Sequence, residues 1–487
     1  MSESCFATID TCRIKDLLVS FSESDKDTVV GDNKLREYYS EDFQLLWVGN
    51  FGVDYSADSL LNVLASLNDF GFSGKLFLVD TLQSDLLTVR RLAFDAETDT
   101  VALLARLEYS LTKSFLRYAT GMKYGFFNPY KVLNRKDIDK LEAAKGRRRY
   151  RQLFDIKTEC PTDSFYKVAF NHISPDDIGD FLDGLHPQSD IYYSLKEMLK
   201  DTALTNEDKA KVVCNMERCR WQGANPDHNQ KKYVVVNIPE FNLYAFDGDS
   251  VEFMKIGCGT TRNKTPLLVS NIKWMEVNPV WIIPKSIIEN EVCAHIGDTA
   301  YFIRNRYSII DKKSGDTIDA INVTKQMLKS GSYRIVQKEG PGNSLGRLVF
   351  RFPNNLSIYL HDTNSPGFFR NNRRTVSHGC VRVERPFDFA QYLLENPDEW
   401  LVDRIRISID MKPETDRGKK YVKEHEDEGK EGYRLVKRVN VEPNIPIYIV
   451  YYTVYPDVEK LMQFYPDVYG YDKLILNYIK PFLDISV

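Results

Sequence analysis

The stretch Ser377-His378-Gly379-Cys380-Val381-Arg382 is the most informative part of this sequence, and fifteen residues separate it from His361. A cysteine attacks carbonyl carbons as the thiolate, so an imidazole or a cation close to it controls its reactivity. The chain has only seven histidines and eight cysteines, yet two of these histidines lie close in sequence to Cys380. The stretch indicates a nucleophile site; the alternative is a buried cysteine beside two ordinary histidines.

The neighbours of Cys380 predict how an acyl group is held. Gly379 has no Cβ and allows a carbonyl group to approach the backbone closely. The N–H groups of Gly379 and Cys380 can then donate to a developing oxyanion. Arg382 can bind a substrate carboxylate through two parallel hydrogen bonds. His361 follows a strand-like segment and is the expected base, whereas the adjacent Asp362 either belongs to the site or caps the next turn.

Composition narrows the function classes. Apolar residues make up 43% and charged residues 28% of the chain, which are values typical of globular proteins. The net charge of −4 argues against a nucleic-acid binder. No apolar run is long enough for a transmembrane helix, and the first 30 residues lack the features of a secretory signal. The protein is therefore expected to be cytoplasmic or to have lost a signal. The scattered cysteines predict neither a metal site nor a disulfide framework.

Hydrophobic periodicity predicts an α+β protein. Helical spacing dominates the first half, as in Ala57–Asn68, and β-branched runs such as Tyr233–Ile238 dominate the second. A polar Gly/Pro segment at 222–230 separates the two. The predicted parts are a flexible N-terminal segment (1–30), a helical domain (31–228) and a β-rich domain (229–487) with a helical lid insertion (285–340) and a charged loop (411–432).

The order of several motifs resembles the L,D-transpeptidase family (YkuD-type), in its large YcbB-like subgroup. The family motif is a His, about 14 to 17 residues, and then Ser/Thr-His-Gly-Cys, which His361 and Ser377–Cys380 match. Further segments similar to the family follow the same order: Asn215–Arg218 with Arg220-Trp221, Val236–Pro239, Lys264–Pro266, Asn278–Trp281, Asn343–Arg347, Ile358–Thr363 and Asp467–Asp472. The resemblance implies a helical scaffold domain followed by a β-sandwich catalytic domain.

The resemblance also implies a role for each site residue. Cys380 is the nucleophile and His361 its base, with Gly379 and Cys380 as oxyanion donors. Tyr359 faces the pocket and can donate to the oxyanion, and Arg382 orients the donor peptide. The remaining motif residues are expected at the substrate-binding site: Ser377, His378 and Asp362. His378 is expected to shape the turn rather than to act as the base.

The implied reaction is acyl transfer within peptidoglycan. Cys380 attacks the diaminopimelate–D-Ala bond of a tetrapeptide stem and releases D-Ala. The diaminopimelate amine of a second stem resolves the thioester and forms a third-to-third cross-link. Water as acceptor makes the same site an L,D-carboxypeptidase, and a D-amino acid or a lipoprotein lysine can also accept. No metal or organic cofactor is expected. Carbapenems are expected to acylate the same thiol.

Location and wall attachment are expectations of the same kind. Because of its substrate, we expect the protein in the periplasm of a Gram-negative-type bacterium. A processed N-terminal anchor would place it close to the membrane. The peptidoglycan-binding subdomain common in the subgroup is expected to be absent, because only about 20 residues separate Ile191–Leu195 from Asn215. Two other classes of protein are alternatives. One is a papain-like or NlpC-type hydrolase, in which the Cys usually precedes the His, and the other is a non-catalytic wall-binding scaffold.

Overall fold

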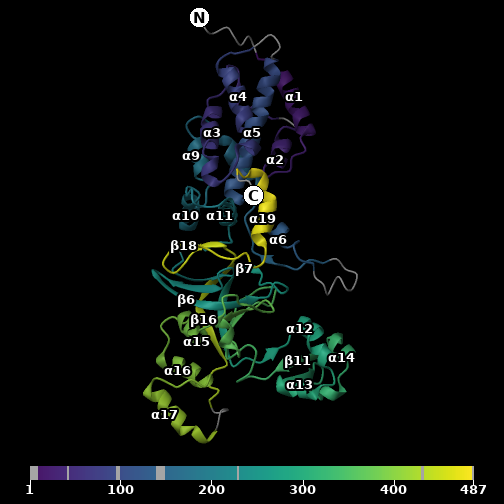
Figure 1. Ribbon diagram of the computed structural model, residues 1–487, viewed down its shortest axis with the longest axis vertical. Helices are drawn as coiled ribbons and strands as arrows, with labels where there is room; N and C mark the ends of the chain where they lie inside the picture. The colour runs from purple at the N-terminus through teal and green to yellow at the C-terminus, as the bar shows by residue number, and fades with distance from the viewer. Residues whose placement is uncertain are drawn as a thin grey trace. The chain divides into compact units, whose positions relative to one another are not determined.

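The computed structural model describes residues 9–40, 43–94, 99–138, 149–226, 230–428 and 433–484. Contacts divide the chain into two units, which we name the helical unit (Met1–Asn225 with Tyr452–Val487) and the sheet unit (Pro226–Tyr451). The predicted α+β class, with a helical first part and a β-rich second part, is confirmed (Figure 1). The contacts group residues 452–487 with the helical unit, whereas we expected them in the β-rich domain.

The helical unit is built around one long helix, α5 (Thr100–Tyr124). The Asp99 carboxylate caps it by accepting hydrogen bonds from the N–H groups of Val101 and Ala102. Four helices lie beside it: α1 (Thr11–Ser24), α2 (Asp32–Tyr38), α3 (Ser56–Leu64) and α4 (Val79–Arg90) (Figure 1). The further α-helices in the described part of the unit are α6 (Pro129–Leu133), α8 (Asp163–Asn171), α9 (Ile178–Asp183), α10 (Asp190–Met198), α11 (Asn206–Cys219) and α19 (Tyr471–Ile479).

The N-terminal segment differs from the flexible stretch that we expected over 1–30. Residues 11–24 form α1, and the fully buried Ile14 and Leu18, four positions apart, pack it against α5. Directly after α1, the Asp25 carboxylate accepts a hydrogen bond from Lys113 of α5 at 2.7 Å. The polar surface of α1 masked this apolar stripe in the sequence. Residues 1–8 lie outside the described part.

Two features of the helical unit bear on its connections. Residues 199–205 join α10 directly to α11, and the side chain of Thr205 caps α11, which leaves no room for a further domain between these helices. In the C-terminal segment, Asp472 of α19 forms a buried ion pair of 2.5 Å with Arg218 of α11. This pair and the apolar side of α19 explain why residues 452–487 belong with the helices.

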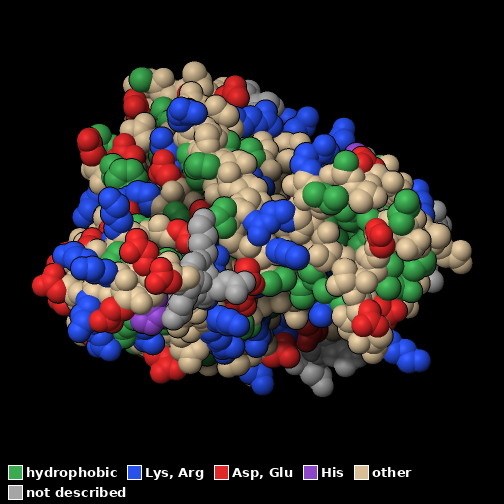
Figure 2. All heavy atoms as spheres, turned by 90° about the horizontal axis from the view of Figure 1, so that it is seen from below, with side chains coloured by type: hydrophobic (Ala, Val, Ile, Leu, Met, Phe, Trp, Pro, Cys, Tyr) green, Lys and Arg blue, Asp and Glu red, His purple; other side chains and the backbone are tan. Residues whose placement is uncertain are grey.

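The sheet unit is a sheet that closes on itself. Its strands are β4 (Lys232–Asn237), β5 (Asn242–Asp247), β6 (Ser250–Gly259), β7 (Leu267–Val277), β12 (Leu348–Arg351), β13 (Leu360–His361), β14 (Thr375–Ser377), β15 (Val381–Val383) and β16 (Arg438–Val450). They pair in the order β12-β13-β15-β6-β5-β4-β16-β7, and β12 also pairs with β7. The interior of this closed sheet is filled by buried side chains that include Val234, Val236, Leu348 and Phe350. The face in Figure 2 mixes basic and acidic side chains.

The segment expected as a helical lid has a sheet of its own. Strands β9 (Tyr307–Asp311), β10 (Thr317–Ile318) and β11 (Tyr333–Gln337) form a sheet with β8 (Trp281–Ile282), in the order β10-β9-β11-β8. Helices α12 (Lys285–Asn290), α13 (Thr299–Arg304) and α14 (Lys325–Ser330) pack beside them (Figure 1). A separate apolar cluster that includes Val292, Ile309 and Ile335 stabilises this segment. We keep the name lid for residues 285–340.

In the sheet unit, β15 is followed by α15 (Pro386–Leu393), α16 (Glu399–Ser408) and α17 (Asp416–Glu424). The last corrects the expected charged loop at 411–432, because residues 416–424 are helical. Thr415 caps α17 by accepting from the N–H of Gly418, and the Asp403 carboxylate holds this cap by accepting a hydrogen bond from the N–H of Thr415 at 2.9 Å. Residues 429–432 of that prediction lie outside the described part.

Candidate active site

Strand register places four of the predicted residues on one face of the sheet. Strands β13 and β15 are parallel, with Leu360 opposite Val381 and His361 opposite Arg382. Side chains alternate between the two faces of a strand. Cys380 and Arg382 therefore lie on the same face as Tyr359 and His361. The N–H of Val381 donates to the carbonyl oxygen of Tyr359 at 3.1 Å, which extends this pairing to the residues just before each strand.

The turn that carries Cys380 is closed by its own side chains. Ser377 Oγ donates to the carbonyl oxygen of Cys380 at 2.5 Å and accepts from the N–H of Gly379 at 3.1 Å. Gly379 has φ +129°, and Thr265 Oγ1 donates to its carbonyl oxygen at 2.8 Å. Ser377 thus shapes the turn, and its place at the substrate site stays a prediction. Of the two expected oxyanion donors, the N–H of Gly379 is already engaged, and the N–H of Cys380 has no partner among the described residues.

The thiol of Cys380 is partly exposed and protonated in this arrangement. Its Sγ donates to the carbonyl oxygen of Ser357 at 3.7 Å. Desolvation raises the pKa of the thiol to about 11. Hydrogen bonds to Tyr359 and the positive charges of Arg351 and Arg382 act in the opposite direction. The nucleophile therefore rests as a thiol near neutral pH and must lose its proton when it attacks.

His361 is buried, with 4% of its surface exposed, in the tautomer that a base needs. Its Nδ1 lies 2.5 Å from the carbonyl oxygen of Asp362. Because a carbonyl oxygen only accepts, Nδ1 carries the proton and Nε2 keeps its lone pair. Burial and the positive charge of Arg382 lower the pKa of His361 to about 3. The imidazole is thus neutral near neutral pH.

The second histidine has a different environment. His378 is exposed, and its Nε2 lies 2.5 Å from Glu291 Oε1 in the lid. Its ring nitrogen is thus engaged by a carboxylate of another segment. This geometry favours His361 as the base and leaves His378 as a contact between the turn and the lid.

Asp362, which we expect at the substrate site, supports a loop. One carboxylate oxygen accepts from the N–H of Arg347 at 2.7 Å and the other from the N–H of Thr363 at 2.6 Å. The carboxylate also fills the space where a side chain at Gly346 (φ +68°) would lie. Burial raises the pKa of this carboxyl group. Both oxygens are therefore used within the protein.

Arg382 has the features of an anion-binding group. Its guanidinium lies over the Phe368 ring, 5.6 Å from the centroid. Its Nε is buried without a hydrogen-bond partner, and among the described residues it forms no ion pair. A half-buried guanidinium without a carboxylate partner among the described residues is suited to an anionic group. Within the described ranges, no group of three or more His, Cys, Asp and Glu side chains is placed to hold a metal ion.

Comparison with known proteins agrees with this geometry. Residues 231–407, which contain the whole site, match the L,D-transpeptidase catalytic domain. The chain contains an L,D-transpeptidase catalytic domain. Residues 33–199 match a model described as a scaffold domain. A Haemophilus influenzae protein named "Putative L,D-transpeptidase" is 27% identical over 303 residues, which cover 61% of this chain and 55% of the relative. The matched part thus spans about half the length of that relative.

One residue of this L,D-transpeptidase site was missed in the sequence. Arg351 of β12 lies opposite Tyr359, because Phe350 pairs with Leu360 in an antiparallel register. Its guanidinium lies 4.3 Å from the centroid of the Tyr359 ring and forms an ion pair of 2.9 Å with Glu276 of β7. The signal was an arginine inside the apolar run Leu348–Phe352. Such a residue needs a polar or aromatic partner across the sheet.

Proposed function

We propose that this protein is a peptidoglycan L,D-transpeptidase that works through a thioester on Cys380. The shared face of Cys380, His361, Tyr359 and Arg382 is the observation that carries the proposal. Cys380 Sγ attacks the carbonyl carbon of diaminopimelate in the diaminopimelate–D-Ala amide, and its proton passes to Nε2 of His361. The same proton goes to the nitrogen of D-Ala as the amide bond breaks.

The second half of the reaction reverses these roles. The diaminopimelate amine of a second stem attacks the thioester, and His361 takes a proton from the attacking nitrogen. The thiolate leaves and recovers a proton, which gives a third-to-third cross-link and the free enzyme. The N–H of Cys380 and the hydroxyl of Tyr359 stabilise the oxyanion of each tetrahedral intermediate. Arg382 binds a carboxylate of the donor stem.

The product mixture tests this proposal. Purified disaccharide-tetrapeptide is incubated with the wild-type protein or with Cys380→Ala, and the products are identified by mass spectrometry. We expect free D-Ala and third-to-third dimers with the wild type and neither with the variant. If tripeptide monomers were the only product besides D-Ala, the protein would be an L,D-carboxypeptidase and not a transpeptidase. Unchanged substrate, or equal products from Cys380→Ala, would overturn the proposal.

The cell envelope is the proposed place of action, because its substrate occurs there. None of the helices in the described ranges has both the length and the apolar character that crossing a membrane requires. We further propose that carbapenems acylate Cys380, since their strained amide presents the same carbonyl chemistry to the thiol. Intact-mass detection of a carbapenem adduct, absent in Cys380→Ala, tests this point.

A further inference from the structure

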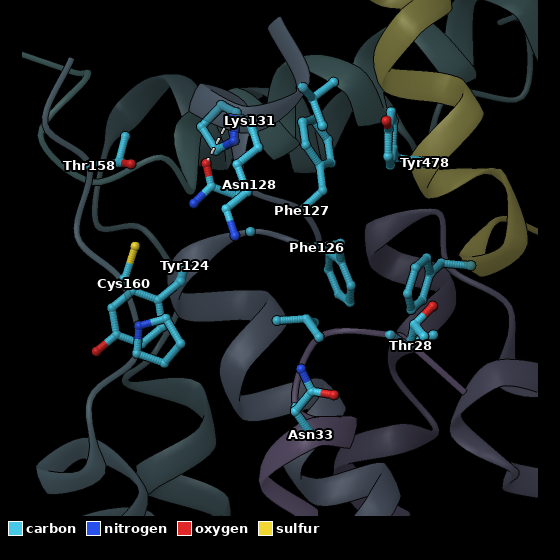
Figure 3. A pocket seen from close by; sticks show the side chains of 18 of the residues that line it. Thr28, Asn33, Tyr124, Phe126, Phe127, Asn128, Lys131, Thr158, Cys160 and Tyr478 are labelled. Carbon is cyan, nitrogen blue, oxygen red and sulfur yellow. Dashed lines mark hydrogen bonds between the residues drawn. The ribbon is translucent and has the colours of Figure 1, made fainter. Parts of the chain in front are cut away.

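The helical unit contains a cavity of about 750 Å³ that the proposed reaction does not use (Figure 3). All the segments that form it belong to this unit: residues 28–34, 124–135, 158–166 and 477–482. Its volume lies within the range of about 300–1,000 Å³ that is common for ligand sites. The cavity is thus large enough for a ligand and belongs to a different unit from Cys380.

Aromatic rings form much of its wall. Phe126 and Phe482 are buried and form part of the interior, whereas Tyr478 is 47% exposed. The rings of Phe127 and Tyr478 lie together, with centroids 5.2 Å apart and planes at 31° (Figure 3). Tyr124 faces the cavity from the other side in this view. Ring faces of this kind carry partial negative charge and attract polarised C–H groups.

Side-chain amides supply hydrogen-bond donors between the rings. Asn128 Oδ1 accepts from the N–H of Lys131 at 3.0 Å, and its Nδ2 has no partner among the described residues. Asn33 Oδ1 accepts from Arg36 at 2.5 Å, which also leaves its amide nitrogen available. The side chain of Asn477, on α19, makes no hydrogen bond with another described residue. The amide nitrogens of these three residues can donate to hydroxyl or acetamido oxygens.

The charge of the lining favours an anionic ligand. Lys131 and Arg135 line the cavity and form no ion pair with any described residue. Lys34 is different, because it pairs with Glu37 and Asp163 at 2.8 and 2.9 Å. Glu159 is the acidic residue of the lining. Two uncompensated cations beside rings and amides suit a polar chain that carries carboxylates.

We infer that this cavity binds a segment of a glycan chain of N-acetylated amino sugars, the strand that carries the peptide stems. Sugar rings stack their C–H faces on Phe127 and Tyr478, and the asparagines bind acetamido and hydroxyl oxygens. Lys131 and Arg135 bind the lactyl carboxylates of the strand, which are free wherever a sugar carries no peptide stem. The choice of glycan rests on the proposed function, and the site provides the wall attachment that no domain between α10 and α11 supplies.

Binding to stem-free glycan chains tests the inference. The experiment uses the full-length protein with Cys380→Ala, because this substitution prevents turnover. Calorimetry measures the dissociation constant of this protein for glycan chains freed of their peptides. Adding Tyr478→Ala removes one stacking ring. Adding Asn128→Asp removes the donor but keeps the oxygen that caps Lys131. We expect each change to weaken binding by about tenfold, the usual effect of losing an important contact.

Tyr130→Ala is the matched control. Tyr130 is 49% exposed on α6, the helix that Asn128 caps, and it does not line the cavity. It should bind like the parent protein. The inference is overturned if the parent binds no stem-free chain, if Tyr478→Ala and Asn128→Asp bind as tightly as the control, or if free stem peptide competes for the cavity. Release of D-Ala by the wild type from soluble disaccharide-tetrapeptide measures the proposed function separately, so failure of one is distinguishable from failure of the other.

Discussion

At the scale of single residues, the site holds its nucleophile and its base in their neutral forms. Burial raises the pKa of Cys380 to about 11 and lowers the pKa of His361 to about 3. A preformed thiolate–imidazolium pair is therefore unfavourable in the free protein. The proton moves when the carbonyl carbon is attacked, as the developing oxyanion takes over the negative charge.

The pH dependence of thiol alkylation follows from these values. Because the pKa of the folded-state thiol is raised to about 11, its ionised fraction increases about tenfold per unit between about pH 6 and pH 9. We expect the rate of Cys380 alkylation by iodoacetamide, measured by peptide mapping, to rise over this range without a plateau. The same peptide in urea should level off near the ordinary thiol pKa of about 8.5. A plateau below pH 8 in the folded protein would contradict this.

Arg351 is expected to make this thiol more acidic. Its guanidinium stacks on Tyr359, and its charge lowers the pKa of Cys380. Arg351→Met should slow alkylation at pH 8 by about three- to tenfold, which corresponds to a pKa change of up to about one unit. Arg351→Lys keeps the charge and should recover part of the rate. Arg334→Met, at an exposed position of β11, is the control. Equal rates for Arg351→Met and this control would refute the role of Arg351.

The sequence predicted the residues that one local motif brings together. Cys380, His361 and Arg382 were found because a fifteen-residue spacing joins two adjacent strands. Arg351 could not be assigned in this way, because its partner Glu276 is 75 positions away on another strand. Ser377 and Asp362 were assigned to substrate because a motif does not reveal that their oxygens are used by their own loops.

At the scale of elements, the lid contacts the turn that carries the nucleophile. Glu291, between α12 and the rest of the lid, meets His378 at 2.5 Å. Both side chains are about half exposed, at 47% and 49%. An exposed pair of this kind contributes about 0.2–1 kcal/mol. The contact therefore favours one lid position without locking it.

Removing this contact should expose the thiol. We expect Glu291→Ala to increase the ratio of bulky-maleimide to iodoacetamide reactivity at Cys380 by about 1.5- to 5-fold, the range that corresponds to 0.2–1 kcal/mol. Glu339→Ala is the control in the same segment, because its side chain is exposed and forms no ion pair with a described residue. The idea fails if Glu291→Ala and Glu339→Ala give the same ratio.

The lid and α1 show how far secondary structure could be predicted from local sequence patterns. The helices of the lid were expected from local spacing, but β9 and β11 were not. Short half-buried strands such as Tyr307–Asp311 lack a clear alternation, and their pairing depends on segments more than 20 positions apart. In α1, the apolar stripe of Ile14 and Leu18 was too narrow to outweigh the polar residues around it.

At the scale of the whole molecule, the C-terminal residues 452–487 belong to the helical unit with which the chain begins. The boundary expected at 222–230 includes the division after Asn225. The return of residues 452–487 was not predicted, because the contacts that hold them are remote in sequence. Arg218 and Asp472 are 254 positions apart, and Asn215 meets Thr453 at 2.8 Å.

Breaking the buried pair should destabilise the helical unit. Asp472→Ala removes the carboxylate of a buried ion pair, and breaking such a pair typically costs about 3–5 kcal/mol. Urea unfolding followed by circular dichroism should show this loss in the helical transition. Glu197→Ala removes an exposed pair with Lys200 and should change stability by about 0–1 kcal/mol. Similar losses for the two variants would show that Arg218 and Asp472 do not anchor the segment.

The most direct test of the central claim is the mass of the protein during the first half-reaction. The wild-type protein is mixed with disaccharide-tetrapeptide without an added acceptor and analysed by intact mass spectrometry. We predict a mass increase equal to the donor minus D-Ala, mapped to Cys380, with release of one D-Ala per adduct and no adduct in Cys380→Ser. Release of D-Ala without any adduct, or an adduct that persists in Cys380→Ser, would contradict the thioester on Cys380.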